Sequence, residues 1–334
     1  MIPCVLDGVD VEWTRQGSAG QMTFTVLKDA GISFVEGNAV TLCVDGVRVF
    51  CGFVVKKSRG KDHQIEVTCL DQLFYLAQNQ TRYVCKNQEA STAIKILAQE
   101  KDVKFIEATS GRDGVDGSIV DTEYYIEKHR FDSPTSYLDI MQTLLDVTLA
   151  HSGKMFVLYD DFGALTLKNI DDMKYVANGL ALLVNSANAE NFDYESSIEN
   201  SYNEVSLWQP ENGGDNSSGE GKLYEAAHVV DPKNQKAWGM LTYYEELDKD
   251  VTKENAKLKA QQLLELHNQV KRKLSLKGVL DDPRIRPGCS VLVDLNLGDV
   301  AVRKWFMVES VQHHFKNDYS TMDLDVVSSK GFVL

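Results

Sequence analysis

The stretch from residue 252 to 315 constrains the fold most, because its apolar spacing changes from helical to alternating. From residue 252 onward, apolar side chains recur at helical spacing, at Ala256, Ala260, Leu263, Val270 and Leu274, and the predicted helix spans 252–273. This pattern predicts one amphipathic helix. We expect the side chain of Thr252 to cap its first turn, and we expect the basic run 271–273 to suit the negative C-terminal end.

Alternation replaces the helical period in the residues that follow. We expect strands at 274–278, 290–295 and 305–315, with a turn at 282–288 between the first two. The whole stretch predicts a helix beside a small antiparallel barrel or sandwich, and nothing in it looks catalytic. We expect the helix to cover the open face of that barrel or to dock a partner.

A second strong signal is the pair Asp45-Gly46, which separates the alternating runs 40–44 and 47–53. Asp-Gly suits a type I′ turn, so these runs predict a hairpin. Cys43 and Cys51 then point to opposite faces, which argues against a disulfide between them. The predicted register pairs Val44 with Val47, Leu42 with Val49, and Val40 with Cys51.

The pattern is mixed over residues 83–190. One predicted helix holds Ala90, Ala93, Ile94 and Leu97 on a single face. Ser133-Pro134 predicts the start of a second helix that ends near Gly153, because a capping Ser followed by Pro favours helix initiation. A hairpin with its turn at Asp160–Gly163 follows, and residues 111–117 form a predicted polar, Gly-rich loop. We expect a compact α+β unit.

Strand patterns return after this unit. We expect strands at 202–208, 224–230 and 238–244, and an exposed loop at 210–221, where Gly, Asn and Ser are concentrated. The first part of the chain and this last part share one order, in which a turn glycine precedes an alternating strand and an aromatic-rich strand follows.

The predicted fold is therefore mainly β with an α+β insert. We expect a first antiparallel β-barrel domain at 1–82, an α+β middle domain at 83–190, and a second antiparallel β-barrel domain at 191–334. The helix 252–273 flanks the second barrel. A chain of 334 residues is long enough for two or three domains.

Composition excludes several classes of protein. The formal net charge is −14, so the basic surface that grips DNA or RNA is missing, and we expect no sequence-specific nucleic-acid binding. No apolar run has the length of a membrane span, and the N-terminus shows no signal-peptide pattern. The 6 cysteines form no CxxC pair, which is typical of a reducing compartment.

Catalytic and metal-binding motifs are missing from the sequence. There is no Walker loop, GxGxxG, GxSxG or HExxH pattern. His313 and His314 are neighbours in a predicted strand, so they point to opposite faces and cannot easily share a metal ion. Asp160-Asp161 and Asp281-Asp282 are interpreted as turns, since the spaced oxygen ligands of a calcium loop are missing.

Two further patterns leave alternatives open. Glu245, Glu246, Asp248 and Asp250 could form a glycosidase pair, but acids packed this tightly before a helix favour a solvated cluster. Trp208, Trp238 and Trp305 lie in strand-like contexts and could line a sugar-binding face, although core or subunit packing is the better interpretation. The sequence thus predicts no catalytic, cofactor-binding or metal-ligating residue.

Several stretches in succession resemble the baseplate hub protein of PBSX-type prophages and related contractile phage-tail-like particles. The resemblance covers nearly the whole chain in order, and its succession is more specific than any single motif. The stretches are Gly37–Val40, Asp45-Gly46 with Val49–Val54, Leu70–Leu76, Ala90–Ile96, Lys154–Asn169, Ile285–Gly288 and Trp305–Phe315. The hub family is also similar to the central hub of the T-even phage baseplate and to the hub part of type VI secretion spikes.

The resemblance implies two tail-tube-like β-barrel domains per chain and a homotrimer. Such a trimer would form a pseudo-sixfold ring that joins the hexameric tail tube to the trimeric central spike. Implied partners are the tail tube protein, the spike, and the baseplate wedge and tape-measure proteins. The implied site of assembly is the bacterial cytoplasm, and the final place is the baseplate of a virion or a tail-like bacteriocin.

The resemblance implies a structural protein without cofactor, metal or enzymatic activity. Some members of the family carry a cell-wall hydrolase label, but no residues here support one. Two alternatives from other classes remain, namely a tail-associated peptidoglycan hydrolase and a carbohydrate-binding β module. Neither the DNA content of the particle nor the lumen-lining residues follow from the sequence.

Overall fold

The computed structural model describes residues 5–16, 18–27, 33–60, 63–105, 118–177, 180–181, 183–185, 189–210, 223–247, 251–296, 301–316 and 319–327. Contacts divide the chain into two units, which we describe separately. The first comprises Met1–Asp146, Lys154–Tyr194 and Lys273–Leu334, and the second comprises Val147–Gly153 and Glu195–Arg272. The predicted loop at 111–117, and all but the first residue of the loop at 210–221, lie outside the described residues.

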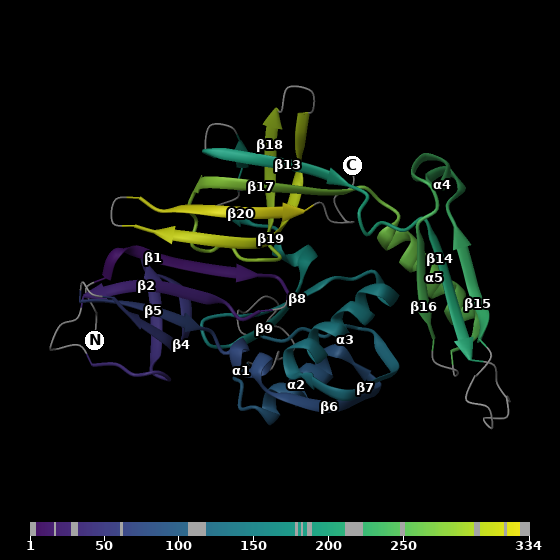
Figure 1. The fold of residues 1–334 in the computed structure, drawn as a ribbon, viewed down its shortest axis with the longest axis horizontal. Coiled ribbons are helices and arrows are strands. Elements are labelled where there is room, and N and C mark those ends of the chain that lie inside the picture. Colours follow the sequence, from purple (N-terminus) through teal and green to yellow (C-terminus); the bar gives the residue numbers. More distant parts are fainter. Residues whose placement is uncertain are drawn as a thin grey trace. The chain divides into compact units, whose positions relative to one another are not determined.

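One large sheet dominates the first unit (Figure 1). Its strands are β1 (Val5–Thr14), β2 (Gln21–Leu27), β3 (Ala39–Val44), β4 (Val47–Arg59), β5 (Gln64–Leu70), β12 (Leu183–Asn185), β13 (Asn191–Ser197), β17 (Lys271–Leu280), β18 (Ser290–Asn296), β19 (Ala301–Phe315) and β20 (Thr321–Val327). The described strands follow the order β13-β17-β20-β19-β1-β2-β5-β4-β3, and β18 joins β19 to the short β12. The prediction of a mainly β fold is confirmed.

Strands from the two ends of the chain meet at the β1–β19 pair. Residues Val9 to Thr14 of β1 lie opposite Phe315 to Ser310 of β19 in antiparallel register. Buried side chains of both strand groups, such as Val11 and Leu324, belong to one hydrophobic core. The first and last predicted β domains thus contribute strands to one continuous sheet, while the predicted domain boundaries stay a prediction.

The predicted turn of the β3–β4 hairpin is confirmed. Asp45 has a φ of 50° and Gly46 a φ of 81°, as a type I′ turn requires. The predicted register is right for Val44 opposite Val47 and wrong beyond Cys43, because Val49 bulges out of the ladder. The observed pairs are Cys43 with Arg48, Leu42 with Phe50, Thr41 with Cys51, and Val40 with Gly52.

The bulge has a physical reason. Val49 and Phe50 are neighbours, yet they are only 0% and 2% exposed. A regular strand would place one of them outside, so the extra residue lets both enter the core. Cys43 and Cys51 are both free thiols, which confirms that no disulfide joins them.

The middle of the chain combines helices with short sheets. Its elements are α1 (Leu73–Gln78), β6 (Gln80–Glu89), α2 (Ala90–Glu100), β7 (Tyr125–Ser136), α3 (Tyr137–Ser152), β8 (Phe156–Asp160), β9 (Leu165–Asn169), the 3₁₀ helix η1 (Ile170–Met173), β10 (Val176–Ala177) and β11 (Leu180–Ala181). β6 pairs with β7, and β8 pairs with β9, both antiparallel. The predicted apolar face of α2 is confirmed, since Ala90, Ala93, Ile94 and Leu97 are fully buried.

The predicted start of the second helix at Ser133-Pro134 is wrong. Both residues lie in β7, and α3 begins at Tyr137, where the Oγ of Ser136 accepts a hydrogen bond from the backbone N–H of Asp139. Pro134 lies where the register between β6 and β7 shifts. A proline suits such an irregularity because it has no N–H to give to the ladder.

The second unit is a small sheet covered by one helix. Its elements are β14 (Glu204–Pro210), β15 (Leu223–Val230), α4 (Pro232–Trp238), β16 (Thr242–Glu246) and α5 (Lys253–His267). The strand order is β15-β14-β16, and β14 runs antiparallel to β15 and parallel to β16. Ala256, Ala260 and Leu263 of α5 pack against Val205 and Leu207 of β14. The helix therefore covers this sheet, and the prediction that it covers the last barrel is wrong.

The predicted helix 252–273 is also too long. Thr252 caps α5 as expected, since its Oγ1 accepts from the N–H of Asn255 at 3.3 Å. The helix ends at His267, however, and residues 271–273 open β17. Leu274 and Leu276 are both fully buried at an interval of two, so the strand pattern prevails there. Among the described residues, none of the helices has the length and apolar character needed to cross a membrane.

Candidate functional site

A buried polar cluster lies where the beginning, middle and end of the first unit meet. We call it the buried junction and define it as Trp13, Asp71, Asp160 and Arg286. Trp13 lies on β1, Asp71 follows β5, Asp160 ends β8, and Arg286 lies between β17 and β18. The two carboxylates are 1% and 4% exposed. Charged groups so far from water must be paired or hydrogen-bonded.

Backbone groups hold the carboxylate of Asp71. The N–H of Gly20 donates to Oδ2 at 2.8 Å, and the N–H of Leu73 donates to Oδ1 at 2.9 Å. Gly20 must be a glycine, because a Cβ there would lie 2.3 Å from the ring of Trp13 and 2.6 Å from Oδ2 of Asp71. Burial, and then the charge of Asp160, raises the pKa of Asp71 well above its ordinary 3.8.

Asp160 closes the β8–β9 hairpin and also enters the junction. Its Oδ1 accepts from the N–H of Gly163 at 2.8 Å, and its Oδ2 accepts from the side-chain amide of Gln72. Burial raises its pKa to about 6, although these hydrogen bonds and the charge of Arg286 oppose the shift. The predicted hairpin turn is confirmed, and the carboxylate has a second use that the sequence does not reveal.

The guanidinium of Arg286 connects three strands. Nη1 donates to the carbonyl of Asp160 at 3.1 Å, and Nη2 donates to the carbonyl of Val49 at 3.0 Å. Nη2 also lies 3.5 Å from Oδ1 of Asp161. The guanidinium carbon lies 4.9 Å from the centroid of the Trp13 ring, which is within the range of a cation–π contact. Arg286 thereby ties β4, β8 and β1 together.

The junction holds segments together and offers no room for a substrate. The cavity beside it, lined by Trp13, Asp71, Asp160 and Arg286 among others, has a volume of about 10 Å³. A cavity needs about 10–15 Å³ of this kind of space to hold one water molecule, so even one water fits tightly. The two carboxylates with raised pKa values resemble a general acid–base pair, but their enclosure supports a structural role instead.

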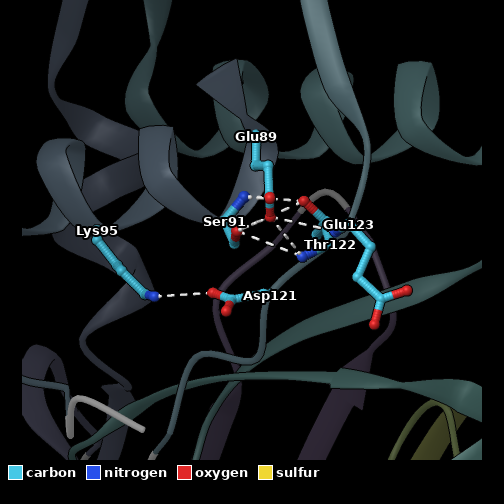
Figure 2. Close-up of polar contacts among 6 residues, drawn as sticks. All are labelled: Glu89, Ser91, Lys95, Asp121, Thr122 and Glu123. Carbon is cyan, nitrogen blue, oxygen red and sulfur yellow. Dashed lines mark hydrogen bonds and ion pairs between the residues drawn. The ribbon is translucent and has the colours of Figure 1, made fainter.

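Figure 2 shows a second polar cluster, between the start of α2 and the segment before β7. Oε2 of Glu89 accepts from the Oγ of Ser91 and from the backbone N–H of Thr122, each at 3.1 Å. It also accepts from the N–H of Glu123 at 3.1 Å, while Lys95 lies 3.2 Å from Asp121. These contacts fix the segment on α2, and they satisfy one another rather than face a cleft.

The neighbouring histidines point to opposite faces, as predicted. His313 is fully buried; its Nδ1 lies 2.5 Å from Oδ1 of Asp281, and its Nε2 lies 3.1 Å from the carbonyl of Ile285. Its ring stacks on Phe315 at 5.5 Å. His314 instead contacts Asp10 at 2.6 Å. Within the described residues, no group of three His, Cys, Asp or Glu side chains could hold a metal ion.

The remaining candidates from the sequence do not converge. Glu245 and Glu246 face opposite sides of β16, and Oε1 of Glu245 accepts from Lys259 at 2.6 Å, so they form no glycosidase pair. Asp248 and Asp250 lie outside the described residues. Trp208 and Trp305 lie on strands as expected, whereas the strand predicted for Trp238 is wrong. Trp238 ends α4, which Asp231 caps with bonds from the N–H groups of Lys233 and Asn234.

Sequence reasoning missed the buried junction, although a signal was present. Asp71, Asp160 and Arg286 each fall inside a stretch that carries the family resemblance. Their residue types fit turns and loops equally well. Only the fold brings Trp13 and Arg286 together across more than 270 positions of sequence.

Comparison with known proteins gives the fold a context. YqbQ of Bacillus subtilis (strain 168) is 25% identical over 98% of this chain and 93% of its own. The phage-like element PBSX protein XkdQ of the same strain is 24% identical over 97% of this chain and 92% of its own. Neither relative is close enough for residue roles to be transferred.

Solved structures share the fold. The 43 kDa tail protein of prophage MuSo2 from Shewanella oneidensis matches 96% of this chain and 93% of its own, with a TM-score of 0.65 and 14% identity. The c3393 protein of E. coli, a type VI secretion component, matches 99% of this chain and 76% of its own, with a TM-score of 0.55 and 12% identity. A family model described as YQBQ-like matches residues 9–327. The chain therefore belongs to the YQBQ-like family.

Proposed function

We propose that this chain is the structural baseplate hub of a contractile phage tail or tail-like particle. In this role it is a homotrimeric adaptor that joins the hexameric tail tube to the trimeric central spike. A structural role in a phage tail is supported by the shared fold of the MuSo2 tail protein and by the PBSX relative. The hub role and the trimer are the finer part of the proposal.

The observation that carries the hub role is the β1–β19 seam. It places the strand group β1–β5 beside the group β17–β20 within one sheet. Three chains would then present six strand groups in a ring, which matches a sixfold tube on one side and a threefold spike on the other. In such a ring, the β1–β19 pairing within one chain would take the place of the contact between two neighbouring subunits of the hexameric tube.

The buried junction supports the same role, because an adaptor under mechanical load needs a rigid body. Arg286 and Gln72 connect the strand groups to the hairpin β8–β9 through hydrogen bonds to Asp160. The hub we propose is not an enzyme, binds no cofactor, and reads no nucleic-acid sequence. Its expected partners are the tail tube, spike, wedge and tape-measure proteins, with assembly in the bacterial cytoplasm and a final place in the baseplate.

The native mass of the purified chain tests the proposal. Light scattering during size exclusion should give three times the 37.4 kDa mass of one chain, and imaging should show a ring with pseudo-sixfold symmetry. If the chain stays monomeric when purified alone, co-expression with the spike decides the matter. A monomer in the presence of the spike and tube proteins contradicts the hub role.

The hydrolase alternative has its own test. The purified chain should leave a cell-wall suspension unchanged over hours, because the buried carboxylates of the junction have no access to a substrate. Clearing of the suspension that disappears on a single acid-to-amide change would establish the enzyme and contradict our proposal.

A further inference from the structure

A cluster of positive side chains stands out on an otherwise acidic chain. We define the basic ribbon as the outer face of the β6–β7 pair: Arg82, Val84, Lys86, Lys128 and Arg130. In the register of this pair, Val84 lies opposite Arg130 and Lys86 lies opposite Lys128. The inner face carries Cys85, which lies between Val84 and Lys86 on β6 and is 0% exposed. Strand alternation therefore turns the basic side chains outward.

The ribbon breaks a local rule of strand pairing. Like charges directly opposite each other, as in Lys86 and Lys128, destabilise an antiparallel pair. Within the described part of the chain, neither lysine forms an ion pair, and Arg130 has only the exposed Asp132 at 2.9 Å. Val84, which lies opposite Arg130, is 51% exposed. Two lysines that face each other without a neutralising carboxylate among the described residues indicate a surface whose partner lies on another molecule.

The second unit carries a surface of the opposite kind. We define the acidic face as Glu225, Trp208, Glu246 and Tyr244. Trp208 of β14 lies opposite Glu225 of β15 on one side and Glu246 of β16 on the other. With strands about 4.8 Å apart, Glu225 and Glu246 lie on either side of Trp208, and their backbones are about 10 Å apart. Tyr244 is 56% exposed, and its ring lies 6.2 Å from that of Trp208.

Hydrogen bonds hold the acidic face in place. Nε1 of Trp208 donates to the Oγ of Ser206 at 2.6 Å, and that hydroxyl lies 2.7 Å from Oε1 of Glu225. Helix α5 covers only the opposite face of the sheet, through Val205 and Leu207. The sequences of β14, β15 and β16 contain no Lys or Arg. The face is therefore a fixed aromatic row with carboxylates, and its three strands carry no Lys or Arg to neutralise them.

We propose that the basic ribbon of one copy docks on the acidic face of the next copy. The inference rests on the proposed homotrimer and names its contact. A lysine or arginine over Trp208 would gain a cation–π contact and two flanking carboxylates. A ribbon that meets a different surface makes a head-to-tail contact, and such contacts close into a ring when three copies related by a threefold rotation meet, as the proposed homotrimer requires. Both complementary surfaces lie on this one chain, which favours a second copy over nucleic acid as the partner.

Charge reversal on the full chain tests the contact. One variant carries Lys86→Glu and Lys128→Glu, a second carries Glu225→Lys and Glu246→Lys, and a third carries all four changes. We expect each of the first two to raise the concentration at half-assembly by about tenfold or more, since like charges then meet. The third restores opposite charges and should assemble almost like the wild type.

Two controls sharpen the test. Lys56→Glu with Arg59→Glu reverses the same number of exposed charges on β4 and should leave assembly unchanged. An equimolar mixture of the first two variants should form complexes containing both chains, which pairing within one chain cannot produce. Circular dichroism checks that every variant is folded.

The outcomes separate this inference from the proposed function. A trimer that forms equally well in all variants overturns the docking and leaves the hub role standing. A wild-type chain that stays monomeric with spike and tube present overturns both. If the ribbon variant forms normal trimers but loses binding to a labelled DNA duplex that the wild type binds, the ribbon serves nucleic acid and the docking is wrong.

Discussion

The guanidinium carbon of Arg286 lies 4.9 Å from the ring centroid of Trp13, inside the buried junction. Trp13 belongs to the first strand of the chain, and Arg286 lies between β17 and β18. The contact therefore adds to the β1–β19 pairing at the place where the two strand groups meet. An indole face and a guanidinium attract each other most when water is excluded, as it is here.

Replacing Arg286 with alanine should destabilise the first unit strongly. The change leaves the carbonyls of Asp160 and Val49 without their donor and removes the charge that faces Asp161. Breaking a buried charge pair costs about 3–5 kcal/mol. We expect a loss of about 3 kcal/mol in the free energy of unfolding, measured by urea denaturation.

Arg303→Ala is the matched control. Arg303 lies 3.5 Å from Asp294, but its side chain is 77% exposed, and exposed pairs contribute about 0–1 kcal/mol. Its variant should unfold within about 0.5 kcal/mol of the wild type. Equal losses in the two arginine variants would contradict the structural role of Arg286.

Stability should fall as the pH rises through the range set by Asp160. Its folded pKa is about 6 and its ordinary value is 3.8, so the folded state binds the proton more tightly than the unfolded state. The stabilisation of the folded state by the protonated Asp160 is fully present below pH 4. It is lost between about pH 4 and pH 6 and amounts to about 3 kcal/mol. Asp71, with its raised pKa, acts in the same direction.

The variant Asp160→Asn isolates this effect. The amide cannot titrate, and Gln72 can turn its own amide to keep the hydrogen bond. The wild-type chain should therefore lose more stability between pH 4 and pH 6 than the variant, by about 3 kcal/mol. The exposed Asp172→Asn serves as control, and parallel curves for wild type and Asp160→Asn would refute the assignment.

The sequence predicted correctly those turns, helix faces and helix caps that depend on a few neighbouring residues. The Asp45-Gly46 turn, the apolar face of α2 and the Thr252 cap all follow from residue type and spacing. The register of β3 and β4 beyond Cys43 does not, because the core accepts Val49 and Phe50 together. Ser133-Pro134 misled for a related reason, since proline fits both a helix start and a strand irregularity.

Contacts between residues that are far apart in the chain could not be predicted from residue type and spacing. Nothing in the letters around Asp71 distinguishes a buried carboxylate from one that caps a turn, and its burial depends on Trp13 and on the hairpin that ends at Asp160. The predicted helix extends beyond the end of α5 because Val270 and Leu274 fit the helical period, although Val270 lies between α5 and β17 and Leu274 lies in β17. In both cases two local conformations fit the sequence about equally well, and tertiary packing determines which one forms.

Gly20→Ala should disturb the junction without changing any charge. The new Cβ would lie 2.3 Å from the ring of Trp13, and the backbone that donates to Asp71 would have to move. Overpacking of this kind costs about 1–3 kcal/mol in the free energy of unfolding. Gly60→Ala is the control, because a Cβ there meets nothing within 4 Å. A Gly20 variant as stable as the Gly60 variant would show that the junction is loosely packed.

Glu89→Ala should release the segment that Figure 2 places against α2. The carboxylate accepts from the N–H groups of both Thr122 and Glu123, and Thr122 is fully buried. Losing a charged acceptor for the N–H of the buried Thr122 costs about 2 kcal/mol. Hydrogen exchange should accelerate at these two amides, while Glu89→Gln, which keeps one acceptor oxygen, should show a smaller change.

The two Glu89 variants separate hydrogen bonding from simple loss of charge. If the loss of negative charge alone mattered, Glu89→Gln and Glu89→Ala would change the exchange rate at Thr122 equally. Glu66→Ala, which removes one negative charge at an exposed position on β5, would then change it by the same amount. We expect instead that Thr122 exchanges fastest in Glu89→Ala, more slowly in Glu89→Gln, and slowest in the Glu66→Ala control. Unchanged protection in Glu89→Ala would mean that the bond between Ser91 and Thr122, at 3.3 Å, holds the segment without Glu89.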